Sequence, residues 1–172
     1  DLPGVYSLTA YSLDEVVARD FLLDEKPDLI VDVLDSTNLE RHLYLCLQFR
    51  ELGIPVVGAL NMSDEAEAKG LRIDAEALSE VLGIPLARTV GTVGAGVEGL
   101  LDLVDAVADG TKGPDRLPGY GDELEDRLAP LVAAVESDAA FAASFPARWM
   151  AVKLLEKDED ARKRLKAHAD SD

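Results

Sequence analysis

The chain begins with Asp1-Leu2-Pro3-Gly4, whose residue types can bind a metal-bound phosphate. A carboxylate such as that of Asp1 can hold Mg²⁺ through a water molecule. Gly4 has no Cβ, so its backbone N–H can approach a phosphate closely. Taken alone, the tetrapeptide favours a simpler alternative, a turn that contains a proline. The phosphate hypothesis therefore depends on what else the chain carries.

A second motif, Asn61-Met62-Ser63-Asp64, follows an apolar run directly. Ligands of open α/β sheets bind beyond the carboxyl ends of the strands, which is where this motif is expected. The Asp64 carboxylate can accept two hydrogen bonds from the N1–H and N2–H₂ edge of guanine, a donor pair that adenine lacks. The alternative is an Asx turn that caps a helix starting at Glu65. Together with the first motif, the pattern favours guanine recognition.

A third loop, residues 89–96, follows another apolar run and contains three glycines. A loop in this place can offer backbone N–H groups to the guanine O6, here from Val90 and Gly91. A flexible connection between a strand and a helix describes the same residues equally well, so both readings stay open. The motif GxxxxGK[ST], which cradles phosphates in nucleotide-binding proteins, is absent from the 172 residues.

The elements that must position these loops alternate along the chain. Three short apolar runs predict buried parallel strands, and amphipathic stretches between and after them predict helices. The predicted strands are 29–34, 56–60 and 85–89, and the predicted helices are 38–52, 74–82 and 97–107. An earlier helix, 12–25, has a capping box made by Ser12 and Glu15. This alternation predicts an α/β fold with a parallel sheet. Together with the two motifs, it leads us to expect a partial P-loop GTPase-like sheet with about three strands remaining.

The composition changes at residues 109–121, which are rich in Pro and Gly and predict a domain boundary. Beyond it, apolar residues recur at helical spacing, Trp149 is expected to anchor a core, and the charged segment 158–168 predicts a solvated or fraying helix. We therefore expect two domains, 1–112 and 113–172, the second small and all-α.

Charge and composition exclude several function classes. The 34 acidic and 17 basic residues give a formal net charge of −17, so nucleic acid is an improbable partner. Cys46 is the only cysteine, which rules out an intrachain disulfide. The sequence has no run of about 20 apolar residues, the length that a membrane-spanning helix needs. Asp32 lies in an apolar run, where we expect a solvated position at a strand edge and no catalytic role.

Longer stretches around these motifs resemble the FeoB-type ferrous iron transporters. Residues 1–15 resemble that family's switch II region, 33–45 its strand-and-helix signature, and 60–66 its base-recognition loop. Residues 120–121 and 148–156 are similar to the helical appendage that follows its G domain. The likeness covers most of residues 1–156 in the family's order, which makes it more specific than any single motif.

The resemblance implies a G domain and a helical, GDP-dissociation-inhibitor-like domain on the cytoplasmic side of the bacterial inner membrane, joined to a membrane domain that passes Fe²⁺. It implies GTP or GDP and Mg²⁺ as ligands, with Asp1 meeting Mg²⁺ through water. The residues that would bind the nucleotide are Asp1, Gly4, Asn61, Met62, Asp64, Val90 and Gly91. A homo-oligomer is compatible with this picture.

The chain departs from the family's pattern in its first part. It starts with Asp1 and lacks a P-loop, so we expect a soluble segment of a longer protein whose partners are the rest of the G domain and the membrane domain. Val5 stands where many GTPases carry a Gln that orients the attacking water, and we expect no GTP hydrolysis by these residues alone. Whether the chain is itself an enzyme stays open.

Two other readings remain. In one, the chain is a non-catalytic regulatory module whose helical part, from Gly121 onward, binds a partner or the switch region. In the other, it is a translation-factor-like GTPase. The helix that carries Arg148 and Trp149 argues against the latter, as does the lack of a basic surface.

Overall fold

A computed structural model describes residues 1–9, 12–111, 117 and 119–170. The chain divides into two compact units, Pro27–Pro118 and a second unit that joins Asp1–Lys26 to Gly119–Asp172. The predicted domain boundary between residues 112 and 113 lies outside the described residues and stays a prediction. None of the helices in the described part is both long and apolar enough to cross a membrane.

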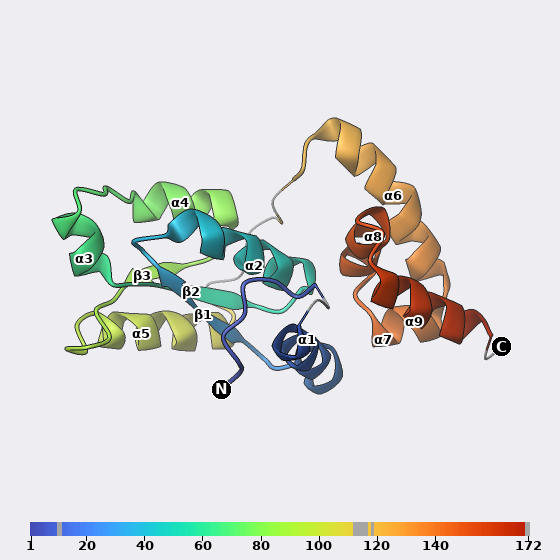
Figure 1. The fold of residues 1–172 in the computed structure, drawn as a ribbon, viewed down its shortest axis with the longest axis horizontal. Helices are drawn as coiled ribbons and strands as arrows, with labels where there is room; N and C mark the ends of the chain where they lie inside the picture. Colours follow the sequence, from blue (N-terminus) through green and yellow to red (C-terminus); the bar gives the residue numbers. More distant parts are fainter. Residues whose placement is uncertain (10–11, 112–116, 118, 171–172) are drawn as a thin grey trace. The chain divides into compact units, whose positions relative to one another are not determined.

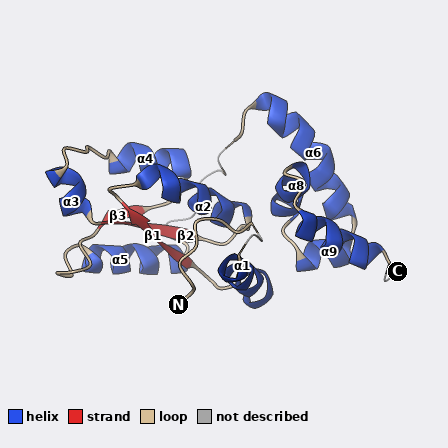
Figure 2. Ribbon diagram, in the orientation of Figure 1, coloured by secondary structure: helices blue, strands red, loops and turns tan. Residues whose placement is uncertain are grey.

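The unit Pro27–Pro118 is an α/β layer structure built on a parallel sheet. Its strands are β1 (Ile30–Asp35), β2 (Val56–Asn61) and β3 (Leu86–Arg88), in the order β1-β2-β3. Its helices are α2 (Leu39–Glu51), α3 (Ser63–Ala68), α4 (Ala75–Leu82) and α5 (Val97–Ala108). Figures 1 and 2 show α2 and α4 on one face of the sheet and α5 on the other. The predicted fold class is confirmed.

Strand β2 lies between β1 and β3 at the centre of this unit, and every residue from Val56 to Leu60 is therefore buried. Gly58 allows β3 to lie against it, since a Cβ at Gly58 would come within 2.3 Å of a Leu86 methyl group. Strand β1 lies at the edge of the sheet, where Val31 and Val33 are 42% and 58% exposed. An apolar face on an edge strand of this kind favours association with other chains.

The second unit is helical. It contains α1 (Leu13–Glu25), α6 (Asp122–Ser137), α7 (Ala139–Ser144), α8 (Ala147–Leu155) and α9 (Glu159–Ala169). Its core includes Leu128, Phe141 and Trp149, all nearly inaccessible to solvent, so the predicted anchoring role of Trp149 is confirmed. The capping box at the start of α1 is also confirmed, because Ser12 and Glu15 exchange both of its hydrogen bonds.

Charged groups hold α1 against α9. Arg19 is only 2% exposed and pairs with Asp160 at 3.2 Å, while Arg164 pairs with Asp20 at 2.7 Å. Helix α9 also buries Ala161. Most residues of α9 are exposed, as expected for a solvated helix over 158–168, but Asp160 and Arg164 form ion pairs with α1.

Candidate functional site

Two of the three predicted binding loops leave the carboxyl ends of neighbouring parallel strands. Asn61 is the last residue of β2, and Thr89 follows directly after β3. Since β2 and β3 are paired in parallel, both loops emerge at the same edge of the sheet. The topology thus brings together residues that are about thirty positions apart in the sequence.

The side chain of Asn61 joins the two loops. Its Oδ1 accepts a hydrogen bond from the Gly91 backbone N–H at 2.9 Å and one from the Thr89 hydroxyl at 3.3 Å. Thr89 adds two backbone bonds, from its N–H to the Leu60 carbonyl at 2.9 Å and from the Ser63 N–H to its own carbonyl at 3.3 Å. Thr89 is 5% exposed, whereas Gly91 is exposed, so this junction is buried only on the Thr89 side. The two loops form one hydrogen-bonded unit.

The second motif turns sharply so that Asp64 faces solvent. Met62 has φ 58° and ψ 32°, a left-handed conformation that is uncommon outside glycine, and α3 begins immediately after it. Asp64 lies in the first turn of α3, is exposed, and makes no hydrogen bond or ion pair to any described residue. Its carboxylate is therefore available to an external donor pair.

The alternative of an Asx turn that caps a helix from Glu65 does not describe this segment. Helix α3 begins at Ser63, its N-cap residue is Met62, and no side chain makes the capping bond. Asp64, the residue that would cap a helix starting at Glu65, lies inside α3.

The third loop is a closed turn. Val90 and Ala95 form an antiparallel bridge, with the Val90 N–H donating to the Ala95 carbonyl at 2.9 Å. Gly96 has φ +77°, and a Cβ there would come within 2.0 Å of the Arg88 carbonyl oxygen, so only glycine fits. The loop is therefore tied down by hydrogen bonds and by the close contact at Gly96, while its contact with a guanine stays a prediction. The amides of Val90 and Gly91 both make bonds within the protein, and any bond from them to a guanine would replace one of these.

The first motif belongs to the other unit. Asp1 and Gly4 are exposed in irregular backbone that leads to α1, and the space where a Gly4 Cβ would lie is open. The open space at Gly4 means that a side chain would fit there, so the expected roles of Asp1 toward Mg²⁺ and of Gly4 toward a phosphate stay predictions. The described residues contain no group of three or more His, Cys, Asp or Glu side chains that could hold a metal. Asp1 would thus supply one carboxylate, and water and phosphate oxygens the other ligands.

A buried carboxylate in β1 was misread from the sequence. Asp32 is 6% exposed and hydrogen-bonds with the thiol of Cys46, which is fully buried. Its other oxygen, Oδ2, has no hydrogen-bond partner among the described residues. Burial raises the pKa of Asp32 to about 6 and also raises the pKa of the Cys46 thiol. The expected solvated position at a strand edge is wrong because α2, which carries Cys46, covers this face of β1.

Comparison with known proteins adds to this geometry. The sequence model described as Ferrous iron transport protein B matches residues 1–104, and the model described as FeoB cytosolic helical domain matches residues 120–172. An Fe(2+) transport protein A/Fe(2+) transporter FeoB fusion protein of Porphyromonas gingivalis is 45% identical over 164 residues. That alignment covers 93% of this chain and 19% of the relative, so the chain spans about a fifth of the relative's length.

Solved structures agree with the sequence matches. The mGMPPNP-bound NFeoB from S. thermophilus superposes with a TM-score of 0.83 at 37% identity, covering 95% of this chain and 60% of that one. The cytosolic domain of T. maritima FeoB in its GDP form II gives a TM-score of 0.85 at 33% identity, covering 96% of this chain and 65% of that one.

Proposed function

This chain belongs to the ferrous iron transport protein B (FeoB) family, and from that premise we propose that it recognises the guanine nucleotide of an iron transporter. The observation that carries the proposal is the junction at Asn61. This side chain ties the loop after β2 to the loop after β3, while the nearby carboxylate of Asp64 stays exposed and unpaired among the described residues. A solvent-facing acceptor on a fixed frame suits a base with two adjacent donors.

Each predicted residue then has a separate role. Asp64 accepts the N1–H and N2–H₂ groups of guanine, and Asn61 holds the frame in shape. Met62 makes the turn that aims Asp64, while Val90 and Gly91 form the wall of the base site. In the other unit, Asp1 meets Mg²⁺ through water and Gly4 the γ-phosphate. NFeoB from S. thermophilus binds mGMPPNP, a guanine nucleotide analogue, which supports the choice of ligand.

For the whole protein we propose coupling of GTP binding and hydrolysis to Fe²⁺ uptake, with this segment on the cytoplasmic side of the bacterial inner membrane. The 172 residues by themselves are expected not to hydrolyse GTP. They contain no GxxxxGK[ST] motif to hold the phosphates, and the apolar Val5 cannot orient an attacking water.

Nucleoside titration tests the base site without involving phosphates. Guanosine added to the ¹⁵N-labelled chain should shift the amide signals of Asp64 and Gly91 saturably, whereas adenosine should not. Asp64→Ala should abolish the shifts, and Asp102→Ala, an exposed aspartate on α5, should leave them intact. Equal responses to guanosine and adenosine would sink the proposal. Phosphate release from GTP, measured in parallel, should stay at the level of buffer.

The helical unit supports a second, regulatory role. Helix α1 directly follows the segment of Asp1 and Gly4, and the buried Arg19 and the half-buried Asp20 pair with α9. We infer that the helical part restrains the segment that would sense the γ-phosphate. Hydrogen exchange at the α1 amides measures this restraint directly.

A further inference from the structure

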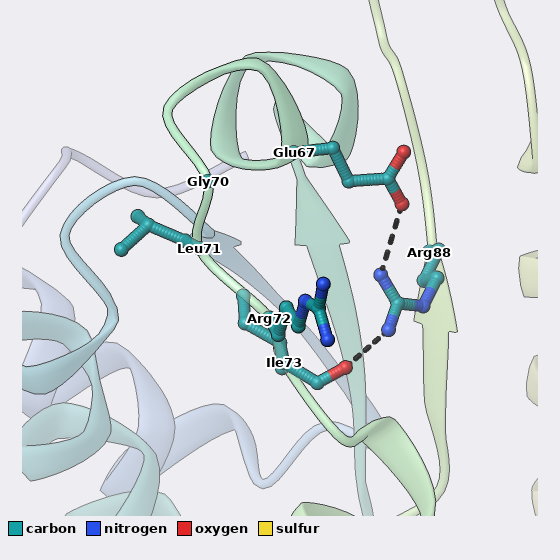
Figure 3. A pocket seen from close by; sticks show the side chains of 6 residues that line it. All are labelled: Glu67, Gly70, Leu71, Arg72, Ile73 and Arg88. Carbon is teal, nitrogen blue, oxygen red and sulfur yellow. Dashed lines mark hydrogen bonds and ion pairs between the residues drawn. The ribbon is translucent and has the colours of Figure 1, made fainter.

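A hollow of about 440 Å³ lies at the C-terminal end of α3, and none of the residues assigned to the base lines it. It is enclosed by the C-terminal part of α3, the connection to α4, and β3 (Figure 3). Its lining residues are Glu67, Gly70, Leu71, Arg72, Ile73 and Arg88. A volume of this size is within the range of sites that bind small molecules.

One of its two arginines is held in place by the protein. The Arg88 guanidinium donates a hydrogen bond to the Ile73 carbonyl and pairs with the Glu67 carboxylate at 3.5 Å, as Figure 3 shows. The ion pair is weak, because the Glu67 side chain is 69% exposed and surface pairs contribute little. The backbone contact therefore orients Arg88, and Glu67 can give way to a stronger anion.

The other arginine has no partner. Among the described residues the Arg72 side chain makes no hydrogen bond or ion pair, and Figure 3 shows its guanidinium reaching into the same hollow as that of Arg88. Two guanidinium groups and one carboxylate give this hollow a formal charge of +1, on a chain whose net charge is −17. Two like charges that converge on one space repel each other unless an anion lies between them.

We propose that this hollow binds a phosphate group, held by Arg72 and Arg88, either as free phosphate or as the phosphate of a small monoester. The planar fork of a guanidinium matches phosphate oxygens with two parallel hydrogen bonds, and two forks suit a group that carries up to two negative charges. A carboxylate offers one charge and two oxygens, which is less than two arginines can use. Leu71 also lines the hollow and is 42% exposed, with its side chain turned away from the two guanidinium groups (Figure 3).

Titration of the ¹⁵N-labelled chain with inorganic phosphate, at constant ionic strength and about pH 7.5, tests the site. The Nε–H signals of Arg72 and Arg88 should shift saturably, and acetate should give a much weaker response. Arg72→Gln should weaken phosphate binding by about tenfold, the expected effect of losing charged hydrogen bonds. Because Arg72 is exposed, this variant should fold normally, which circular dichroism verifies.

Lys69→Gln is the matched control. It removes the same charge from the same connection, but Lys69 does not line the hollow, so binding should change less than twofold. Shifts that grow linearly without saturation would overturn the proposal, as would equal effects of Lys69→Gln and Arg72→Gln, or equal binding of acetate. The phosphate titration reads the Nε–H signals of Arg72 and Arg88, whereas the guanosine titration reads the amide signals of Asp64 and Gly91. Either proposal can therefore be refuted without affecting the other.

Ribose 5-phosphate distinguishes the two sources of the phosphate group. Tighter binding of ribose 5-phosphate than of inorganic phosphate identifies a monoester. Equal binding of both identifies free phosphate. If ribose 5-phosphate and inorganic phosphate both bind more weakly than acetate, the assignment of Arg72 and Arg88 as a phosphate site is contradicted.

Discussion

Replacing Asp32 with Asn should stabilise the unit Pro27–Pro118 at neutral pH, and the effect should vanish in acid. Asn has nearly the shape of Asp, and its Oδ1 can still accept the hydrogen bond from the Cys46 thiol. The substitution removes the negative charge that β1 and α2 bury. Asn therefore imitates the protonated carboxyl group at every pH.

The sign and size follow from the raised pKa of Asp32. Burial raises this pKa from 3.8 to about 6, so the folded protein binds the proton more tightly than the unfolded chain does. Below about pH 3.8 both states are protonated and the cost of burying the charge is absent. As the pH rises toward 6 that cost grows, and the stability contributed by the protonated group is lost. Each unit by which the pKa is raised corresponds to about 1.4 kcal/mol, so the full cost of burying the charge is about 3 kcal/mol.

Cys46 provides the assay for this unit, because Trp149 lies in the other unit and its fluorescence does not report on β1. Cys46 is the only cysteine and is fully buried, so its exposure in urea can be followed with 4,4′-dithiodipyridine, which also reacts with thiols in acid. The difference in unfolding free energy between Asp32→Asn and the unchanged chain should grow by about 2.4 kcal/mol between pH 4 and pH 7, because about 0.6 kcal/mol of the cost is already present at pH 4. A difference that stays constant with pH, or that Asp102→Asn on the surface of α5 reproduces, would refute the reasoning.

Two further substitutions probe the loop after β3 and the link between α1 and α9. Gly96→Ala should destabilise the chain by about 3 kcal/mol or more in urea unfolding, because its Cβ would meet the Arg88 carbonyl. Gly94→Ala is the control, because Gly94 has φ +72° but open space around it, and it should lower the free energy of unfolding by only about 1 kcal/mol. Equal losses of stability in the two variants would count against the close contact between the Gly96 position and the Arg88 carbonyl. Arg19→Met should speed hydrogen exchange in α1 with a loss of about 2 kcal/mol, less than for a fully buried pair because Asp20 and Asp160 are partly exposed. Unchanged α1 exchange would argue against the proposed restraint.

Elements with local signals could be predicted from the sequence. The runs 29–34 and 56–60 predicted β1 and β2, since a strand buried on both faces leaves a continuous apolar pattern. Only β2 is buried in this way, because β1 lies at the sheet edge and exposes Val31 and Val33. Ser12 and Glu15, three residues apart, marked the start of α1 through a capping box that depends only on neighbouring residues. The order of these elements was enough to predict a parallel sheet.

Features that depend on distant residues could not be predicted. The Asn61 oxygen binds Gly91, thirty positions later, and no local pattern encodes this bond. Asp32 looked like a polar residue at an edge, but its environment is set by Cys46 on α2. Likewise, Arg72 and Arg88 share a hollow only because β3 returns beside the end of α3.

A change of base preference at Asp64 tests the central claim most directly. Xanthine carries a carbonyl oxygen where guanine has its 2-amino group, so an Asn amide can donate to the base where the Asp64 carboxylate accepts. The shift of the Gly91 amide signal, titrated with guanosine and with xanthosine, measures both preferences. We predict that the unchanged chain prefers guanosine and that Asp64→Asn prefers xanthosine. The same preference in both proteins would contradict guanine recognition by Asp64.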